Sequence, residues 1–210
     1  MIARLPHWTP GQRIGLMGGS FNPPHDGHLL VSQLVLKRLK LDRLWWLVTP
    51  GNPLKPTAGL PALAARMEAA RALARDPRIA VTGFEADIGA RFTHDSIAWL
   101  VRRAPHAHFV WIMGADNLRQ FHLWRRWRDI AGLVPIAVVD RPGSTLRALS
   151  SHAGAALAPF RANERDAAGF AVRPAPALIF LHGPRSNASS TAIRQEAPAP
   201  ERPPHVADGR

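Results

Sequence analysis

The chain contains no cysteine among its 210 residues, which excludes disulfide bonds and thiolate metal sites. It also lacks a long apolar run. No stretch approaches the roughly 20 apolar residues that a membrane-spanning helix needs, and residues 1–13 hold no apolar segment of signal-peptide length. The sequence therefore predicts a cytoplasmic protein that makes no use of a membrane.

Acidic residues are few: Asp and Glu total 15 against 27 Lys and Arg, a formal net charge of +12 at pH 7. This excess favours polyanionic partners, either nucleic acid or polyphosphates such as ATP, although arginines dispersed over a solvated surface give the same total. Only residues 124–128 interleave basic with aromatic side chains. The sequence therefore argues against nucleic acid as the main partner.

Two common phosphate-binding loops are missing. A Walker A loop needs Gly-Lys followed by Ser or Thr, and no Gly-Lys pair occurs in the chain. A dinucleotide-binding fingerprint needs an acidic residue about 20 residues after its glycines. Here the predicted second strand, 44–48, ends in Thr49-Pro50-Gly51 without an acid.

The segment GGSFNPPHDGH, residues 18–28, is the most informative part of the chain. It follows an apolar run, 14–17, that predicts a strand, and precedes a helical pattern over 29–36. Its glycines allow a turn or close approach of a ligand, and a helix N-terminus attracts anions. His25 and His28 suit a phosphate better than a hydrophobic core. They also have a possible zinc spacing, but no HExxH motif or third ligand accompanies them. The segment predicts a nucleotide-phosphate loop.

Strands and helices alternate along the chain, which predicts an α/β fold with a doubly wound, Rossmann-like parallel sheet. We expect one domain over 1–195, with its core from about 13, and a disordered tail over 196–210. Such sheets bind ligands beyond the carboxyl ends of their strands. The predicted strands are 14–17, 44–48, 79–82, 109–113, 136–139 and 178–181; helices are predicted over 29–39, 61–75 and 96–103, with helical pieces over 118–130.

The motif H-x-G-H, with GGSFNPP before it, strongly resembles the signature of the nucleotidyltransferase superfamily, and more closely that of bacterial nicotinate-nucleotide adenylyltransferases. The resemblance implies that His25 and His28 contact the triphosphate of ATP and stabilise charge developing on the α-phosphate and pyrophosphate. It assigns four further residues of the loop to ATP and phosphate binding: Gly18, Gly19, Ser20 and Phe21.

A second superfamily signature, S-x-T-x-x-R, follows the last predicted strand as Ser189, Thr191 and Arg194. By resemblance these residues and a helix N-terminus hold the outer phosphates of ATP, where the planar fork of arginine suits phosphate oxygens. Alone, the hydroxyls could be only an N-cap. Lys55 lies where the family carries a basic residue after a proline-rich loop, although a solvated lysine is an equally good interpretation.

Two middle segments resemble the nicotinate enzymes in particular. Gly114 and Asp116 match a G-x-D turn in which the carboxylate can accept from ribose hydroxyls. Trp124 offers a flat face for stacking a pyridine ring, whereas Phe121, Trp124 and Trp127 could instead form a core stripe, which we prefer for Trp127. Thr93 matches a threonine that contacts the nicotinate carboxylate. It could also cap its helix.

The resemblance covers about residues 14–194 and implies adenylyl transfer from ATP to nicotinate mononucleotide in NAD biosynthesis, with Mg²⁺ accompanying ATP. Alternative acceptors are nicotinamide mononucleotide, phosphopantetheine and a phospho-sugar; the segments around Trp124 and Thr93 argue against the last two. The pattern gives no oligomeric state. Family members usually continue with a further helix, whereas Pro198, Pro200, Pro203 and Pro204 prevent one here.

Overall fold

The chain folds around a six-stranded, all-parallel sheet in the part that the computed structural model describes, residues 3–51, 59–140 and 145–183. The order across the sheet is β3-β2-β1-β4-β5-β6. Every neighbouring pair is parallel. The strands are β1 (Arg13–Gly19), β2 (Arg43–Val48), β3 (Ile79–Thr82), β4 (His108–Gly114), β5 (Ile136–Val139) and β6 (Leu178–Leu181).

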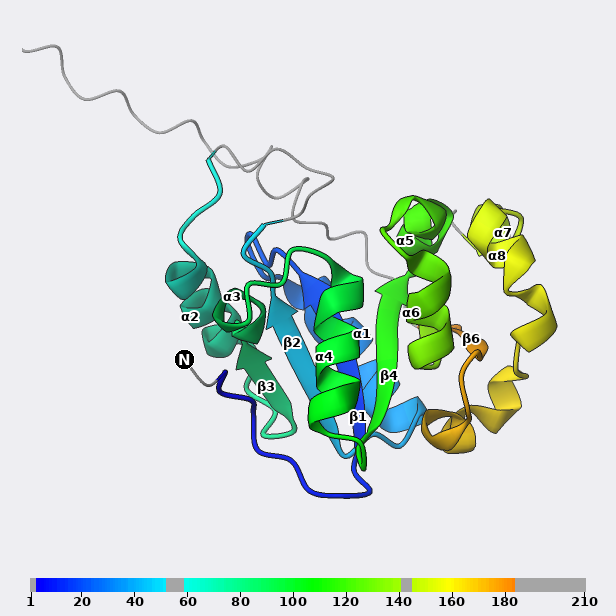
Figure 1. Ribbon diagram of the computed structural model, residues 1–210, viewed down its shortest axis with the longest axis horizontal. Helices are drawn as coiled ribbons and strands as arrows, with labels where there is room; N and C mark the ends of the chain where they lie inside the picture. The colour runs from blue at the N-terminus through cyan, green and yellow to red at the C-terminus, as the bar shows by residue number, and fades with distance from the viewer. Residues whose placement is uncertain (1–2, 52–58, 141–144, 184–210) are drawn as a thin grey trace, which may run out of the picture.

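Helices cover both faces of this sheet, with α4 and α6 in front of it and α1 behind it in the view of Figure 1. The helices are α1 (Asp26–Arg38), α2 (Leu63–Leu73), α3 (Phe84–Asp87), α4 (Thr93–Arg103), α5 (Ala115–Gln120), α6 (Trp127–Leu133), α7 (Thr145–Leu149) and α8 (His152–Ala156). The 3₁₀ segments are η1 (Phe121–Leu123), η2 (Ala158–Phe160) and η3 (Glu164–Val172). None of the described helices is both long and apolar enough to cross a membrane.

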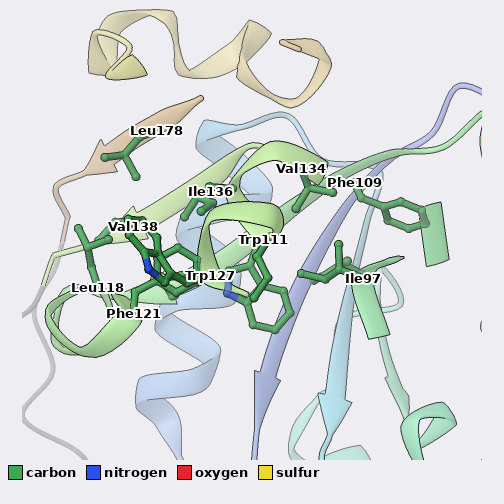
Figure 2. Close-up of a cluster of buried hydrophobic side chains, with 14 of the residues drawn as sticks. Ile97, Phe109, Trp111, Leu118, Phe121, Trp127, Val134, Ile136, Val138 and Leu178 are labelled. Carbon is green, nitrogen blue, oxygen red and sulfur yellow. The ribbon is translucent and has the colours of Figure 1, made fainter. Parts of the chain in front are cut away.

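The sheet separates two hydrophobic cores, because successive residues of a strand point to opposite faces. Trp45 packs in the core beneath α4, α5 and α6, whereas Trp46 packs in the core beneath α1, α2 and η3. Figure 2 shows the first core, where Trp111 and Phe109 of β4 meet Ile97 of α4. Strands buried on both faces need continuous apolar runs, which explains why the sequence located all six.

The fold prediction is confirmed, and the differences lie at the ends of elements. Gly18 and Gly19 belong to β1 rather than to the loop after it. Residues 114–117 are not an irregular turn, because Gly114 ends β4 and α5 begins at Ala115. The prediction that Thr93 caps a helix is wrong: the N-cap is Phe92, and Thr93 is the first helical residue. The domain boundary at 195 and the tail lie outside the described residues and stay predictions.

Candidate active site

The central strands β1 and β4 mark the point where the chain changes direction across the sheet. The connection after β1 crosses to β2 through α1 on one face, and the connection after β4 crosses to β5 through α5 and α6 on the other. Open parallel sheets bind ligands outside the carboxyl ends of the strands at this switch point. The strand order therefore places the ends of β1 and β4, with Gly18 and Gly114, at the expected site.

Both histidines of the H-x-G-H motif build the first turn of α1. His25 is the N-cap, and its Nδ1 accepts from the backbone N–H of Gly27 at 3.1 Å. Reciprocally, Nδ1 of His28 accepts from the backbone N–H of His25 at 3.2 Å. A neutral imidazole carries one proton, so accepting at Nδ1 places that proton on Nε2. Each ring is therefore a hydrogen-bond donor at Nε2, as a phosphate ligand requires.

An aromatic stack holds these two rings. The ring centroids of His25 and His28 lie 3.9 Å apart, Phe21 lies 4.8 Å from His28, and Trp46 stacks on Phe21 at 4.9 Å. The indole N–H of Trp46 donates to the hydroxyl of Ser32 at 2.9 Å, which in turn donates to the carbonyl of His28 at 2.7 Å. The orientation of His28 is thus fixed by its ring, its Nδ1 and its carbonyl.

Trp111 of β4 joins the end of β1 to the predicted nicotinate side. A Cβ on Gly18 would lie 2.7 Å from Cη2 of the Trp111 indole, so only glycine lets the loop strand lie this close. On its other side Trp111 meets Trp124 edge to face, with ring centroids 6.2 Å apart. Trp124 also meets Phe121 at 5.4 Å. Trp124 is half-buried and Trp127 is buried, which confirms the core role expected for Trp127.

The two predicted nicotinate segments are brought together although about 30 residues separate them. The guanidinium of Arg125, next to Trp124, lies over the ring of Phe92 with 4.7 Å between Cζ and the ring centroid. Phe92 precedes Thr93 at the start of α4. Asp116 lies in the first turn of α5, directly beyond the end of β4. The elements that carry Thr93, Trp124 and Asp116 thus follow the carboxyl ends of β3 and β4, the same end of the parallel sheet at which β1 leads to the histidines.

Comparisons with known proteins identify the family of the chain. The sequence profile described as cytidylyltransferase-like matches residues 16–196. A protein of Methylorubrum extorquens (strain PA1) named "Probable nicotinate-nucleotide adenylyltransferase" is 63% identical over 182 residues, covering 87% of this chain and 98% of that protein. The protein of the same name from Rhizobium johnstonii is 52% identical over 190 residues, covering 90% of this chain and 96% of that protein. The chain belongs to the nicotinate-nucleotide adenylyltransferase family.

Solved structures show the same fold at much lower sequence similarity. The Plasmodium falciparum nicotinic acid mononucleotide adenylyltransferase complexed with APC has a TM-score of 0.62 at 14% identity, covering 88% of this chain and 83% of that chain. A putative nicotinate-nucleotide adenylyltransferase from Vibrio parahaemolyticus has a TM-score of 0.52 at 18% identity, covering 64% of this chain and 77% of that chain. The architecture is therefore that of the nucleotidyltransferases.

Four of the predicted site residues lie outside the described residues: Lys55, Ser189, Thr191 and Arg194. Within the described residues, no three His, Cys, Asp or Glu side chains are grouped as a metal site. Mg²⁺ keeps several waters and binds through substrate phosphates and one or two carboxylates, so its binding does not require such a group of protein side chains.

A buried acid at the start of α3 is a feature that sequence reasoning missed. Glu85 is 8% exposed, and its Oε1 accepts from the hydroxyl of Ser96 at 2.6 Å. Burial raises the pKa of Glu85, an effect that hydrogen bonds from Ser96 and Thr49 only partly oppose. Thr49 directly follows the last residue of β2, and Ser96 lies in the first turn of α4. Glu85 therefore ties the carboxyl end of β2 to the helix that begins at Thr93.

We expect Glu85 to make stability fall as the pH rises. Its pKa is about 4.5 when unfolded and higher when folded, so above that pH the folded state binds more protons and the free energy of unfolding decreases until the folded pKa is passed. Glu85→Gln keeps an acceptor for Ser96 and removes the titration. As the pH rises above about 4.5, its melting temperature should therefore fall less than that of the wild type.

The matched control is Glu68→Gln, which changes an exposed acid on α2. Its pH profile of melting temperature should follow that of the wild type. Parallel profiles for Glu85→Gln and wild type would mean that Glu85 titrates in the folded protein as it does in the unfolded chain.

Proposed function

We propose that this chain uses the switch-point site to transfer the adenylyl group of ATP to nicotinate mononucleotide, giving deamido-NAD and pyrophosphate. The observation that carries the proposal is the first turn of α1. There the backbone fixes Nδ1 of both His25 and His28 as acceptors, so that a neutral ring carries its proton on Nε2 near the end of β1. Hydrogen-bond donors fixed in advance are what a triphosphate undergoing substitution needs.

The reaction is an in-line displacement at the α-phosphorus of ATP. A phosphate oxygen of the mononucleotide forms the new P–O bond, the bond from the α-phosphorus to the oxygen bridging to the β-phosphate breaks, and pyrophosphate leaves with the electron pair. The attacking phosphate is already ionised near neutral pH, so it needs no strong general base. Catalysis then consists of positioning and charge stabilisation, as in phosphoryl transfer. Mg²⁺ belongs to the substrate as its complex with ATP, where it neutralises phosphate charge.

The proposed site residues form two groups, one that binds ATP and one that binds the mononucleotide. His25 and His28 donate to the α-phosphate and to the oxygen that becomes part of pyrophosphate, and the segment Gly18, Gly19, Ser20 and Phe21 lies along the triphosphate. Lys55, Ser189, Thr191 and Arg194 are proposed for the outer phosphates from the family signatures. Of these four, Lys55 and Arg194 are positively charged and contribute to the net charge of +12.

On the acceptor side, the half-buried indole of Trp124 stacks on the pyridine ring, and the start of α4 at Thr93 receives the carboxylate. The N–H groups of a first helical turn favour an anion over a neutral amide. Gly114 ends β4 and Asp116 lies in the first turn of α5, where a carboxylate can accept from ribose hydroxyls. The contact between Arg125 and Phe92 supports this grouping, because it keeps the Trp124 and Thr93 segments adjacent.

The direct test is pyrophosphate release with ATP and Mg²⁺, comparing nicotinate mononucleotide with nicotinamide mononucleotide. We expect a preference for the acid of up to about 30-fold, since an anion at a helix N-terminus is favoured by up to about 2 kcal/mol over a neutral group. Equal rates would retain adenylyl transfer and refute the role of α4 in carboxylate binding. No reaction with either mononucleotide would refute the proposed acceptor, and phosphopantetheine would be assayed next.

A further inference from the structure

Arg66 on α2 is a buried cation that lies close to the phosphate loop. It is only 3% exposed. Its guanidinium donates to four backbone carbonyls: Nη1 to Ser20 and Thr49, both at 2.8 Å, Nε to Pro61 at 2.9 Å, and Nη2 to Pro50 at 3.4 Å. One side chain therefore joins the loop after β1, the end of β2 and the beginning of α2.

The charge of this guanidinium has no acidic partner in the part of the chain that the structure describes. The ion pairs of the described arginines involve Arg13, Arg38, Arg78 and Arg126. Burial lowers the pKa of Arg66 from its ordinary value, but an arginine starts so high that it stays charged at neutral pH. Carbonyl dipoles stabilise a buried cation without cancelling it. A net positive charge therefore remains beside Ser20.

The hydrogen bond to Ser20 also fixes the peptide that follows it. Among the described residues the bond between Ser20 and Phe21 is trans, so the N–H of Phe21 points away from the Ser20 carbonyl and from Arg66. Phe21 has a φ of 46°, in the left-handed region that a bulky side chain rarely adopts. Such a conformation persists only where its surroundings hold it on several sides. Trp46 and His28 hold the ring of Phe21, and Arg66 holds the preceding carbonyl.

We propose that Arg66 is a positioning residue for ATP, which fixes the phosphate loop against the end of β2 and supplies a buried positive charge that favours the triphosphate. The inference rests on the proposed function for the identity of the anion. It assigns to Arg66 an effect on one substrate only, because its hydrogen bonds reach the phosphate loop, the segment after β2 and the start of α2, and none of them reaches the Trp124 or Thr93 segment.

Lysine cannot replace arginine fully in this arrangement. An ammonium keeps the charge but lacks the planar fork that reaches several carbonyls in fixed directions. The two contributions can therefore be separated: Arg66→Lys keeps the charge and loses part of the positioning, and Arg66→Met loses both at similar volume. The matched control is Arg71→Met, which removes an exposed arginine from the same helix.

The experiment measures ATP affinity by calorimetry without an acceptor, at two salt concentrations, together with the KM of each substrate. We expect Arg66→Met to weaken ATP binding by about tenfold or more, to flatten the salt dependence of ATP affinity, and to leave the KM of the mononucleotide within about twofold. Arg66→Lys should weaken ATP binding less and keep the salt dependence. Arg71→Met should match the wild type in all three measurements.

Two results would overturn the proposal. The first is an Arg66→Met variant whose ATP affinity and salt dependence match those of the wild type and whose melting temperature alone is lower. Arg66 would then be a purely structural residue. The other is an equal rise in the KM of both substrates. If Arg66→Met does not fold, wild-type ATP affinity in Arg66→Lys overturns the positioning role. A wild type that binds ATP without adenylating either mononucleotide refutes the proposed function instead, and the ATP comparison is still decisive for Arg66.

Discussion

His28→Asn is expected to lower kcat by about 100-fold or more, the scale for losing one electrostatic group that stabilises a transition state. The amide oxygen of asparagine can still accept from the backbone N–H of His25, as Nδ1 does now. Its side chain is too short to place a donor where Nε2 lies. The substitution therefore removes the proposed phosphate contact while keeping the capping contact of α1, and steady-state pyrophosphate release measures the loss.

Two further variants and a spectroscopic control test whether the loss of the hydrogen-bond donor at Nε2 of His28 causes this effect. His28→Gln, which is long enough to present an amide N–H near the position of Nε2, should lose less activity than His28→Asn. His108→Asn, at the exposed amino end of β4, should have no effect. Circular dichroism should report the same helix content in all variants. Turnover near that of the wild type in a folded His28→Asn enzyme would exclude His28 from the chemistry.

Gly18→Ala is expected to destabilise the protein and to reduce its activity together. The new Cβ would lie 2.7 Å from Cη2 and 3.4 Å from Cζ2 of Trp111, a rigid indole that is only 3% exposed. Overpacking of this kind costs about 1–3 kcal/mol. The strain is relieved by moving either the loop strand or the indole that contacts Trp124, and a 1 Å displacement at a reacting centre can cost about 100-fold in rate. Thermal melting and turnover measure the two effects.

The double variant Gly18→Ala/Trp111→Phe tests the cause. The smaller ring of phenylalanine leaves room for the new methyl group, so the double variant should be less destabilised than the sum of the two single variants. Gly132→Ala in α6 is the control, because nothing lies within 4 Å of its added Cβ; helix propensity predicts a gain of up to about 1 kcal/mol there. Additive effects in the double variant would contradict the clash with Trp111.

The strands and the phosphate loop could be predicted from sequence because their signals are local. Buried parallel strands need continuous apolar runs, and β4, β5 and β6 each show one. The H-x-G-H loop combines glycines, histidines and a helix start within eleven residues. The N-cap of α4 was harder. A threonine at the expected position favoured a cap, but the extended backbone of Phe92 begins the helix one residue earlier.

Arg66 and Trp111 could not be assigned from sequence, because their roles depend on segments far away along the chain. The apolar pattern over 61–75 predicts that Leu63, Met67, Ala70 and Leu73 share the face that packs on the sheet, and an arginine between them is ordinarily solvated. Its burial depends on the carbonyls of Ser20 and Thr49, which only the folded sheet places within reach. Likewise, the need for glycine at 18 arises from Trp111, on another strand.

The reciprocal contacts between His25 and His28 both orient the two imidazole rings and cap the first turn of α1. The nitrogens that aim the rings are the same ones that satisfy the backbone N–H groups of Gly27 and His25. Fraying of this single turn would free both imidazoles at once, while the paired strands stay intact. Helix ends open at a lower free energy than the whole domain. At a given temperature, the fraction of molecules competent for catalysis therefore depends on local melting of residues 25–28 as well as on global unfolding.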